Sequence, residues 1–313
     1  MRAESVLQEN PIHRSGPRVV AVGGGKGGVG KSVVSTNFAL ALARQGKRCA
    51  LIDADLGGAN LHTLLGIPFP KHTLGDFLSR DLTSLQDVMV PTSAADLWLI
   101  SGARALLEVA NPSHAQKMKI IRQIFKLDVD YVIIDLGAGT NFNVLDFFLS
   151  AHDQVLVVVP TPTSIENAYY FLKAVFFRKL KRAIRETGVV HAVESALHQR
   201  LQRQVRYPRQ LLAGIREISA EAGEAVAREL RSFVPRVVIN QVRRPEEKGL
   251  GEEMAIACRD FFGIEVRPLG AIRHDDNVLR AVQMRRPVLQ AFPTCSFSQE
   301  IQEIARHLAD HGV

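Results

Sequence analysis

Cysteine is scarce in this chain of 313 residues, which contains three, at Cys49, Cys258 and Cys295. They are far apart and form no CxxC pair and no Cys/His pattern of metal-ligand spacing. This argues against a zinc site and against an iron–sulfur scaffold that needs paired cysteines. An odd number of scattered cysteines is typical of reduced thiols in a cytosolic protein. We therefore expect three free, mostly buried cysteines and a cytoplasmic location.

Long hydrophobic runs are also lacking. No stretch of about 18 apolar residues exists, so we expect no membrane-spanning helix. The first residues contain no apolar segment of the secretory type, and we expect no signal peptide. Hydrophobic residues make up 46% of the chain and charged residues 23%, as in ordinary globular proteins. The formal net charge of +7 permits contact with nucleic acid or an anionic membrane but establishes neither.

What is present is a series of short, continuously apolar runs that alternate with helical stretches. Such runs are typical of strands whose two faces are both covered, as in a parallel sheet between helix layers. The sequence therefore predicts an α/β fold with a mostly parallel sheet flanked by helices on both faces. The predicted strands cover residues 18–22, 49–53, 98–101, 131–135, 154–159, 236–241 and 266–272. A helix is predicted over 33–45, ended by Gly46.

The chain divides into a polar N-terminal segment and one large domain. Residues 1–17 are expected to form a flexible tail, and residues 18–313 a single domain. A helical insertion of two or three helices is predicted at about 174–234, before the strand that begins at residue 236. Its first part is strongly basic, with Lys173, Arg178, Lys179, Lys181, Arg182, Arg185, Arg200, Arg203, Arg206 and Arg209.

A glycine-rich loop follows the first predicted strand, and residues 25–32 fit the pattern G-x-x-x-x-G-K-[ST]. Glycines let backbone N–H groups converge on phosphate oxygens, and the N-terminal end of the next helix favours the same anion. Lys31 is placed to reach the β- and γ-phosphates, and the Ser32 hydroxyl to bind Mg²⁺. We predict ATP and Mg²⁺ as cofactors. The predicted nucleotide-binding residues here are Gly25, Gly27, Gly28, Val29, Gly30, Lys31, Ser32 and Val33.

Carboxylates follow two of the predicted strands. Asp53 and Asp55 end the second strand, and Asp135 ends the apolar run YVII. Ligands of open α/β sheets gather at the carboxyl ends of strands. An ionised group after four buried residues needs a partner, and Mg²⁺ is a suitable one for Asp135. The predicted metal site is Ser32, Asp53 and Asp135. The alternative for Asp55 and Asp135 is a structural role as a cap of the next helix.

The run KGGVGKS, with Lys26 early in the loop, resembles the deviant Walker A motif of the MinD/ParA family of P-loop ATPases. The resemblance covers about residues 19–164 and 236–289. It implies an ATPase that forms a homodimer with ATP sandwiched at the interface, where Lys26 touches the partner's phosphates. The implied catalytic residues are Lys26, Lys31 and Asp55.

The same resemblance assigns two switches and a base site. Switch I would contain Asp53, Asp55 and Asn60, with Asp55 positioning the hydrolytic water. Gly139, in the flexible run after Asp135, is placed to donate its N–H to the γ-phosphate. Asn240 would read the edge of the adenine, and residues around Pro268 and Leu269 would pack on the base.

Several segments resemble the flagellar-number regulator branch (FlhG/FleN-like) of the family. They are DADLGGANLHTLLG, DLGAG and PTPTSIENAYYFLK. Two features depart from that branch: residues 1–17 lack its DQA-type motif, and the insertion is longer. At the C-terminal end, Phe297, Ile301, Ile304 and Leu308 lie at helical spacing beside mainly acidic residues. This pattern favours a last helix that faces the core over a helix that binds a membrane.

Two main functions are compatible with these features. The first is an ATP-dependent dimerisation switch that positions or regulates a cellular assembly, with a protein partner. The basic insertion could then contact that partner or a membrane, placing the protein peripherally on the cytoplasmic face of the inner membrane. The alternative is a ParA-like partition ATPase that binds DNA non-specifically through the same insertion. An iron–sulfur carrier on this scaffold is disfavoured because paired cysteines are absent.

Overall fold

The computed structural model describes residues 16–55, 57–79, 82–102, 112–186 and 209–310. Their framework is an eight-stranded sheet in the order β3-β4-β2-β5-β1-β6-β7-β8. Every neighbouring pair is parallel except β3 and β4. The strands are β1 (Arg18–Gly23), β2 (Cys49–Asp53), β3 (Val90–Pro91), β4 (Leu97–Ile100), β5 (Tyr131–Asp135), β6 (Asp153–Val158), β7 (Arg236–Val242) and β8 (Arg267–Arg273). The predicted mostly parallel sheet is confirmed.

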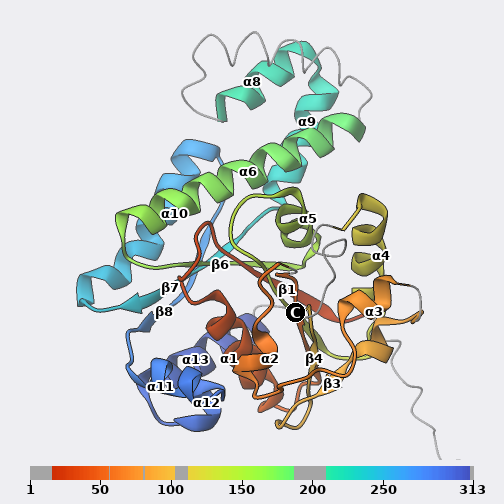
Figure 1. Ribbon diagram of the computed structural model, residues 1–313. Helices are drawn as coiled ribbons and strands as arrows, with labels where there is room; N and C mark the ends of the chain where they lie inside the picture. The colour runs from red at the N-terminus through yellow and green to blue at the C-terminus, as the bar shows by residue number, and fades with distance from the viewer. Residues whose placement is uncertain (1–15, 56, 80–81, 103–111, 187–208, 311–313) are drawn as a thin grey trace, which may run out of the picture.

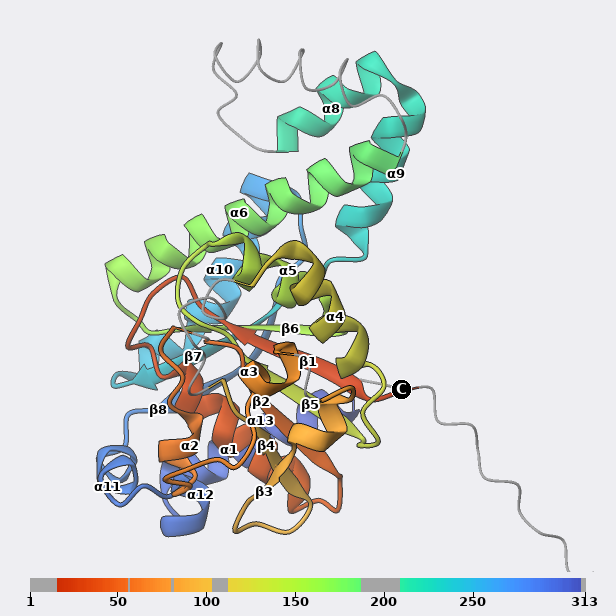
Figure 2. The ribbon, with the colours of Figure 1, turned by 45° about the vertical axis from the view of Figure 1, so that its right-hand side comes forward.

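Helices cover both faces of the sheet (Figures 1 and 2). One face carries α1 (Lys31–Ala43), α2 (Leu61–Leu64), α11 (Asn277–Gln283), α12 (Val288–Ala291) and α13 (Ser296–Asp310). The other carries α3 (Leu74–Leu78), α4 (His114–Ile124), α5 (Phe142–Ser150), α6 (Pro162–Glu186), α9 (Ala220–Arg231) and α10 (Leu250–Phe262). The remaining elements are two 3₁₀ turns, η1 (Leu85–Val88) and η2 (Pro245–Gly249), and helix α8 (Arg209–Ile218), which precedes α9 in the chain and packs against it.

The central strands are buried from end to end, as the continuous apolar runs predict. Every residue of β2 and β5 is buried, including the aspartates that end them. Edge strand β3 is absent from the sequence prediction. This strand pairs antiparallel with β4 and has only two residues, one of them a proline. So short a segment has no hydrophobic pattern from which a strand could be predicted.

The last helix faces the core. Phe297, Ile301, Ile304 and Leu308 are all buried, at most 3% exposed, and α13 packs against α1 and β8. The predicted core-facing stripe is confirmed. Among the residues that the structure describes, no helix is long and apolar enough to cross a membrane.

The predicted insertion does not begin with a new element. Helix α6 runs unbroken for 25 residues from Pro162 to Glu186, so residues 174–186 continue a helix of the main fold. After residues 187–208, which lie outside the described part of the chain, α8 and α9 pack on each other and α9 packs on α6. Lys179 of α6 pairs with Glu229 of α9 at 3.0 Å. The expected tail falls almost wholly on residues 1–15, which are also outside the described ranges.

The three cysteines are free, as predicted, with Cys49 and Cys258 buried and Cys295 partly buried. Burial raises the pKa of the Cys258 thiol to about 12, so it is protonated and unreactive at neutral pH.

A buried ion cluster ties three strands together at the edge opposite their carboxyl ends. The Asp153 carboxylate, on β6, is 3% exposed. It pairs with the Arg18 guanidinium of β1 at 2.5 Å and with the Arg236 guanidinium of β7. Because both arginines are largely buried, neither could be hydrated fully if the carboxylate were lost.

We expect Asp153→Ala to lower the free energy of unfolding by about 3–5 kcal/mol, because it leaves two buried cations unpaired. Urea unfolding followed by circular dichroism measures the loss. The control is Asp128→Ala, which removes a carboxylate that is 79% exposed and pairs with Arg48. That substitution should cost less than about 1 kcal/mol. Equal losses in the two variants would contradict the assignment.

Candidate functional site

The glycine-rich loop connects the carboxyl end of β1 to the first turn of α1. Helix α1 begins at Lys31, two residues earlier than predicted, with Gly30 as its N-cap. Gly28 and Gly30 have φ of 79° and 90°, a left-handed conformation that favours glycine. The loop thus leads from the carboxyl end of β1 directly into α1, whose N-terminal end lies at this edge of the sheet and favours an anion.

Lys31 lies inside this loop. Its side chain is nearly buried, and Nζ donates a hydrogen bond to the Lys26 carbonyl at 3.2 Å. Burial lowers the pKa of Lys31, while the nearby charges of Asp135 and Asp55 oppose that shift. A cation withdrawn from water and held by a carbonyl is available to an anion such as a phosphate.

Asn240, at the carboxyl end of β7, holds the loop from the other side. Its Nδ2 donates to the Val29 carbonyl at 2.8 Å, and the side chain is 5% exposed. A Cβ on Gly30 would lie 2.4 Å from the same nitrogen, so the loop fits against Asn240 only with glycine there. Sequence reasoning missed this contact. Reading of the adenine by Asn240 stays a prediction.

The prediction that Pro268 packs on the base is not supported by its position. Pro268 is the second residue of β8, far from that strand's carboxyl end, and pairs in register with Val237 near the start of β7. A Cβ on Gly251 of α10 would meet Pro268 at 3.2 Å, which places the proline on the sheet face opposite α1. The residues that do end β8 at the ligand edge are Arg273 and the following His274. The rule that ligands gather at carboxyl strand ends could have found them.

Asp135 lies directly beneath the start of α1. Its Oδ1 accepts a hydrogen bond from the Ser35 hydroxyl at 2.8 Å, and Ser32 also hydrogen-bonds to it. Burial raises the pKa of Asp135 to about 6, although both hydroxyls and Lys31 stabilise the ionised form. Ser32 and Asp135 are therefore adjacent, as predicted for a magnesium site.

Asp53 is engaged by the loop that follows it. Its Oδ2 accepts the backbone N–H groups of Asn60 at 2.9 Å and Leu61 at 3.0 Å. Burial and the neighbouring carboxylates raise the pKa of Asp53 to about 7, against the effect of these hydrogen bonds. The contacts show Asp53 shaping the predicted switch I loop and the start of α2. A direct bond from Asp53 to Mg²⁺ stays a prediction.

Asp55 and Gly139 flank the open side of the site. The Asp55 carboxylate lies against the backbone of Gly137, where an added Cβ would come within 3.1 Å of it, and Gly58 is nearly as close. It is partly exposed and near enough to influence Lys31 and Asp135. Gly139 has a φ of 96°, so the turn after Asp135 also requires glycine. The structure thus brings the two predicted switches together.

The phosphate loop also packs against the first turns of α6. Lys26 is exposed, and its Nζ donates to the Thr163 hydroxyl at 3.0 Å. A Cβ on Gly25 would lie 2.0 Å from the Asn167 carbonyl oxygen, so backbone meets backbone at this point. Thr163 and Asn167 belong to the run PTPTSIENAYY, which the sequence singled out without placing it at the site.

The donor set fits a nucleotide-bound magnesium ion. Among the described residues, no group of three or more His, Cys, Asp and Glu side chains is arranged to hold a metal alone. Ser32 and Asp135 supply a hydroxyl and a carboxylate, and Mg²⁺ in nucleotide sites takes its remaining ligands from phosphates and water. These residues would hold the ion only together with a bound nucleotide.

Comparison with known proteins agrees with this geometry. A family profile described as ParA, NUBPL iron-transfer P-loop NTPase, matches residues 17–215. The chain belongs to the ParA family of P-loop NTPases. This ParA-family chain is 30% identical over 292 residues to the antiactivator FleN of Pseudomonas aeruginosa, covering 92% of this chain and 85% of FleN. It is 29% identical to the flagellum site-determining protein YlxH of Helicobacter pylori, over 51% of this chain and 54% of YlxH.

Solved structures share the fold of this ParA-family chain. The cell division ATPase MinD of Pyrococcus furiosus superposes with a TM-score of 0.63 at 18% identity, covering 94% of this chain and 99% of that one. MinD of Pyrococcus horikoshii, a complex with Mg-ADP, gives the same TM-score at 20% identity over 93% and 96% of the two chains.

We expect Gly25→Ala to lower the free energy of unfolding of the nucleotide-free protein by about 1–3 kcal/mol, because its methyl group meets the backbone of α6. Thermal and urea unfolding measure this loss. Gly27→Ala is the matched control, since nothing lies within 4 Å of a Cβ there. It should change stability by less than about 0.5 kcal/mol. A Gly25→Ala variant as stable as Gly27→Ala would contradict the contact.

The raised pKa of Asp135 predicts a pH dependence. The folded chain keeps the Asp135 proton up to about pH 6, whereas the unfolded chain releases it near pH 4. The folded state thus binds more protons between these values, and its stability falls as pH rises through this window. In nucleotide-free protein, wild type should lose more than about 1 kcal/mol relative to Asp135→Asn between pH 4 and 7. Urea titrations at several pH values test this, and a constant difference would refute it.

Proposed function

We propose that this chain is an ATP-dependent dimerisation switch that hydrolyses ATP slowly and positions or regulates a cellular assembly. The observation that carries the proposal is the pair of lysines in one loop. Lys31 is drawn into the loop, whereas Lys26 is exposed and points away to Thr163. In this proposal Lys31 would bind the phosphates of the chain's own nucleotide, and Lys26 those of the nucleotide on a second subunit. The names of the relatives FleN and YlxH support a regulatory, spatial role.

Within one subunit, the geometry supports phosphoryl transfer to water. Loop N–H groups and Lys31 would bind the phosphates, and Ser32 with Asp135 would hold the magnesium that neutralises developing charge. Asp55, at the open side and beside Gly137, would orient the attacking water. The water oxygen bonds to the γ-phosphorus as the bond to the ADP oxygen breaks, and positioning rather than strong base chemistry sets the rate. Stimulation by a partner is part of the proposal.

Dimerisation would replace the Lys26 contact. A neutral hydroxyl on Thr163 is a weaker partner for an ammonium group than a phosphate oxygen. When a second subunit presents bound ATP, Lys26 would leave Thr163 for its phosphates. Hydrolysis would then weaken the bridge and release the partner. A cytoplasmic location and contact with a membrane surface stay predictions.

DNA binding by the basic insertion is the alternative. Arg178 shares the carboxylate of Asp146 with Lys117, and Lys179 pairs with Glu229, whereas Lys181 and Arg185 are exposed on α6. Arg200, Arg203 and Arg206 lie outside the described ranges. Retention on DNA compared with anionic liposomes, with ATP and at two salt concentrations, separates the two functions because phosphate binding is strongly salt-dependent.

Iron transfer, which the family description names, finds no matching site in the described residues. Cys49 lies in β2, Cys258 in α10 and Cys295 before α13, and each is a single free thiol. A bridging cluster between two subunits needs cysteines at a shared surface, and two of these three are buried.

We expect Asp55→Ala to accumulate as a dimer with Mg²⁺ and ATP, because nucleotide binds but hydrolysis is blocked. Lys26→Ala should remain monomeric under the same conditions. Size-exclusion chromatography with light scattering measures both, and calorimetry confirms that each variant still binds ATP.

The control for the lysine is Lys47→Ala, an exposed lysine elsewhere that should behave like wild type. A dimer that forms equally with and without nucleotide would contradict the proposed ATP-dependent dimerisation. Absence of magnesium-dependent ATP binding would contradict the proposed ATPase activity as well.

A further inference from the structure

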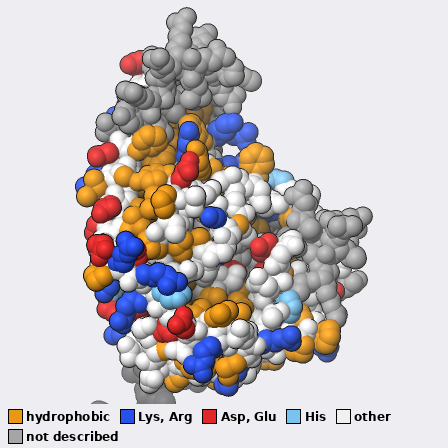
Figure 3. All heavy atoms as spheres, turned by 60° about the vertical axis from the view of Figure 1, so that its left-hand side comes forward, with side chains coloured by type: hydrophobic (Ala, Val, Ile, Leu, Met, Phe, Trp, Pro, Cys, Tyr) orange, Lys and Arg blue, Asp and Glu red, His pale blue; other side chains and the backbone are white. Residues whose placement is uncertain are grey.

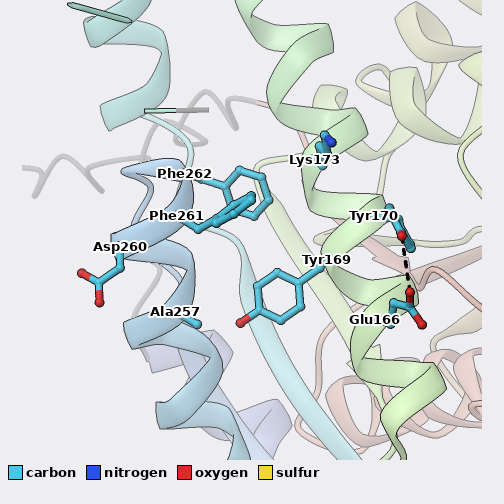
Figure 4. Close-up of a pocket in the computed structure, with 8 residues that line it drawn as sticks. All are labelled: Glu166, Tyr169, Tyr170, Lys173, Ala257, Asp260, Phe261 and Phe262. Atoms are coloured by element: carbon cyan, nitrogen blue, oxygen red, sulfur yellow. Dashed lines mark hydrogen bonds between the residues drawn. The ribbon is translucent and has the colours of Figure 1, made fainter. Parts of the chain in front are cut away.

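A groove separate from the phosphate site lies between α6 and α10 (Figure 4). Its volume is about 530 Å³. The two helices form its walls, and they belong to the face of the sheet opposite α1. The lining residues are Glu166, Tyr169, Tyr170 and Lys173 from α6, and Ala257, Asp260, Phe261 and Phe262 from α10.

The floor of the groove is aromatic and firmly packed. Tyr169 stacks on Phe262 with ring centroids 6.4 Å apart, and Phe262 is fully buried against Phe176. A floor held in this way keeps its shape when the groove is empty. Such preorganisation lowers the cost of binding.

The edges of the groove expose large apolar side chains. Tyr170 on α6 is 55% exposed, and Phe261 on α10 is partly exposed. Figure 3 shows hydrophobic side chains gathered on this side of the molecule, with both acidic and basic side chains around them. Contiguous exposed apolar surface bordered by charge is typical of a protein-binding site.

The charge at the groove differs in sign from that of the chain. The chain carries a net charge of +7. The residues that line the groove nevertheless include two carboxylates, Glu166 on α6 and Asp260 on α10, and one cation, Lys173. The carboxylates lie at its rims: Asp260 extends from the side of α10 that faces away from α6, and Glu166 accepts a hydrogen bond from the Tyr170 hydroxyl (Figure 4). This balance opposes nucleic acid and anionic lipid and favours a cationic partner.

We propose that the groove binds an amphipathic helix of a different protein, with its apolar stripe between α6 and α10 and its Lys or Arg residues facing Glu166 and Asp260. Large apolar side chains at i, i+3, i+4 and i+7 are the usual anchors in a groove of this kind. The site needs no nucleotide, so it stands independently of the ATPase proposal.

The groove shares α6 with the phosphate loop. Thr163, which holds Lys26, lies one helical turn before Glu166 on the groove. Binding of a helix here therefore acts on the same element that contacts the nucleotide site.

The test uses full-length, nucleotide-free protein and a panel of fluorescein-labelled 16-residue synthetic helices. Each carries leucine or phenylalanine at i, i+3, i+4 and i+7, flanked by lysines in one set and by glutamates in the other. Fluorescence anisotropy should show at least tenfold tighter binding of the lysine set. Ala257→Trp, which fills the groove, should weaken that binding at least tenfold. Leu279→Trp adds the same side chain at an exposed site on α11 and should not.

The double variant Glu166→Lys, Asp260→Lys should reverse the preference toward the glutamate set. Failure of every lysine peptide to bind, or binding that Ala257→Trp leaves unchanged, would overturn the proposal. It would equally be overturned if Ala257→Trp abolished self-association or binding to anionic vesicles, because the occupant would then be a second copy or a lipid surface. Dimerisation with ATP is scored separately, so loss of one function does not imply loss of the other.

Discussion

Backbone-to-backbone packing between Gly25 and Asn167 is the contact on which the arrangement of this molecule depends. With no Cβ on Gly25, the phosphate loop lies directly against the first turns of α6, and Asn240 holds the loop from the other side through Val29. The loop is therefore fixed between two walls before any ligand arrives. Preorganised N–H groups of this kind need little rearrangement to receive a phosphate, which is why they bind and catalyse well.

The electrostatics of the site follow from the same enclosure. Asp53 and Asp135 end two adjacent strands in register, so the sheet brings their carboxylates together within a buried region. Lys31 is the cation that the sheet and α1 place among them. Burial is the main cause of the raised pKa values of Asp53 and Asp135, and repulsion between neighbouring carboxylates adds to it, while Lys31 offsets part of the shift of Asp135. Mg²⁺ bound at Ser32 and Asp135 would add positive charge here and reduce that repulsion.

Much of this could be predicted from sequence, and the exceptions have physical reasons. Strands β2 and β5 match residue for residue, because continuous burial leaves an unbroken apolar run, and the GKS pattern located the loop. Pro268 was assigned to the base from the family resemblance, although the predicted strand over 266–272 already places it near the start of the strand and not at the carboxyl end where ligands bind. The hydrogen bond between Asn240 and Val29 joins residues far apart in the sequence, so no local sequence pattern predicts it. The sequence analysis placed the start of the insertion at about residue 174, where the chain becomes basic. A change in charge does not end a helix, so α6 continues through this point to Glu186.

The length of α6 has a mechanical consequence. Its 25 residues form a rod of about 37 Å at 1.5 Å per residue. About two thirds of the way along it, Arg178 makes two hydrogen bonds to Asp146 of α5, the helix that follows the Asp135 turn. The arm toward Pro162 is about 24 Å long and the arm toward Glu186 about 12 Å, so a tilt of about 5° around that pivot would displace the two tips by roughly 2 Å and 1 Å. A small movement of the end beside α9 would thus become a movement about twice as large at the end that contacts the phosphate loop, where closely packed atoms leave little room for it.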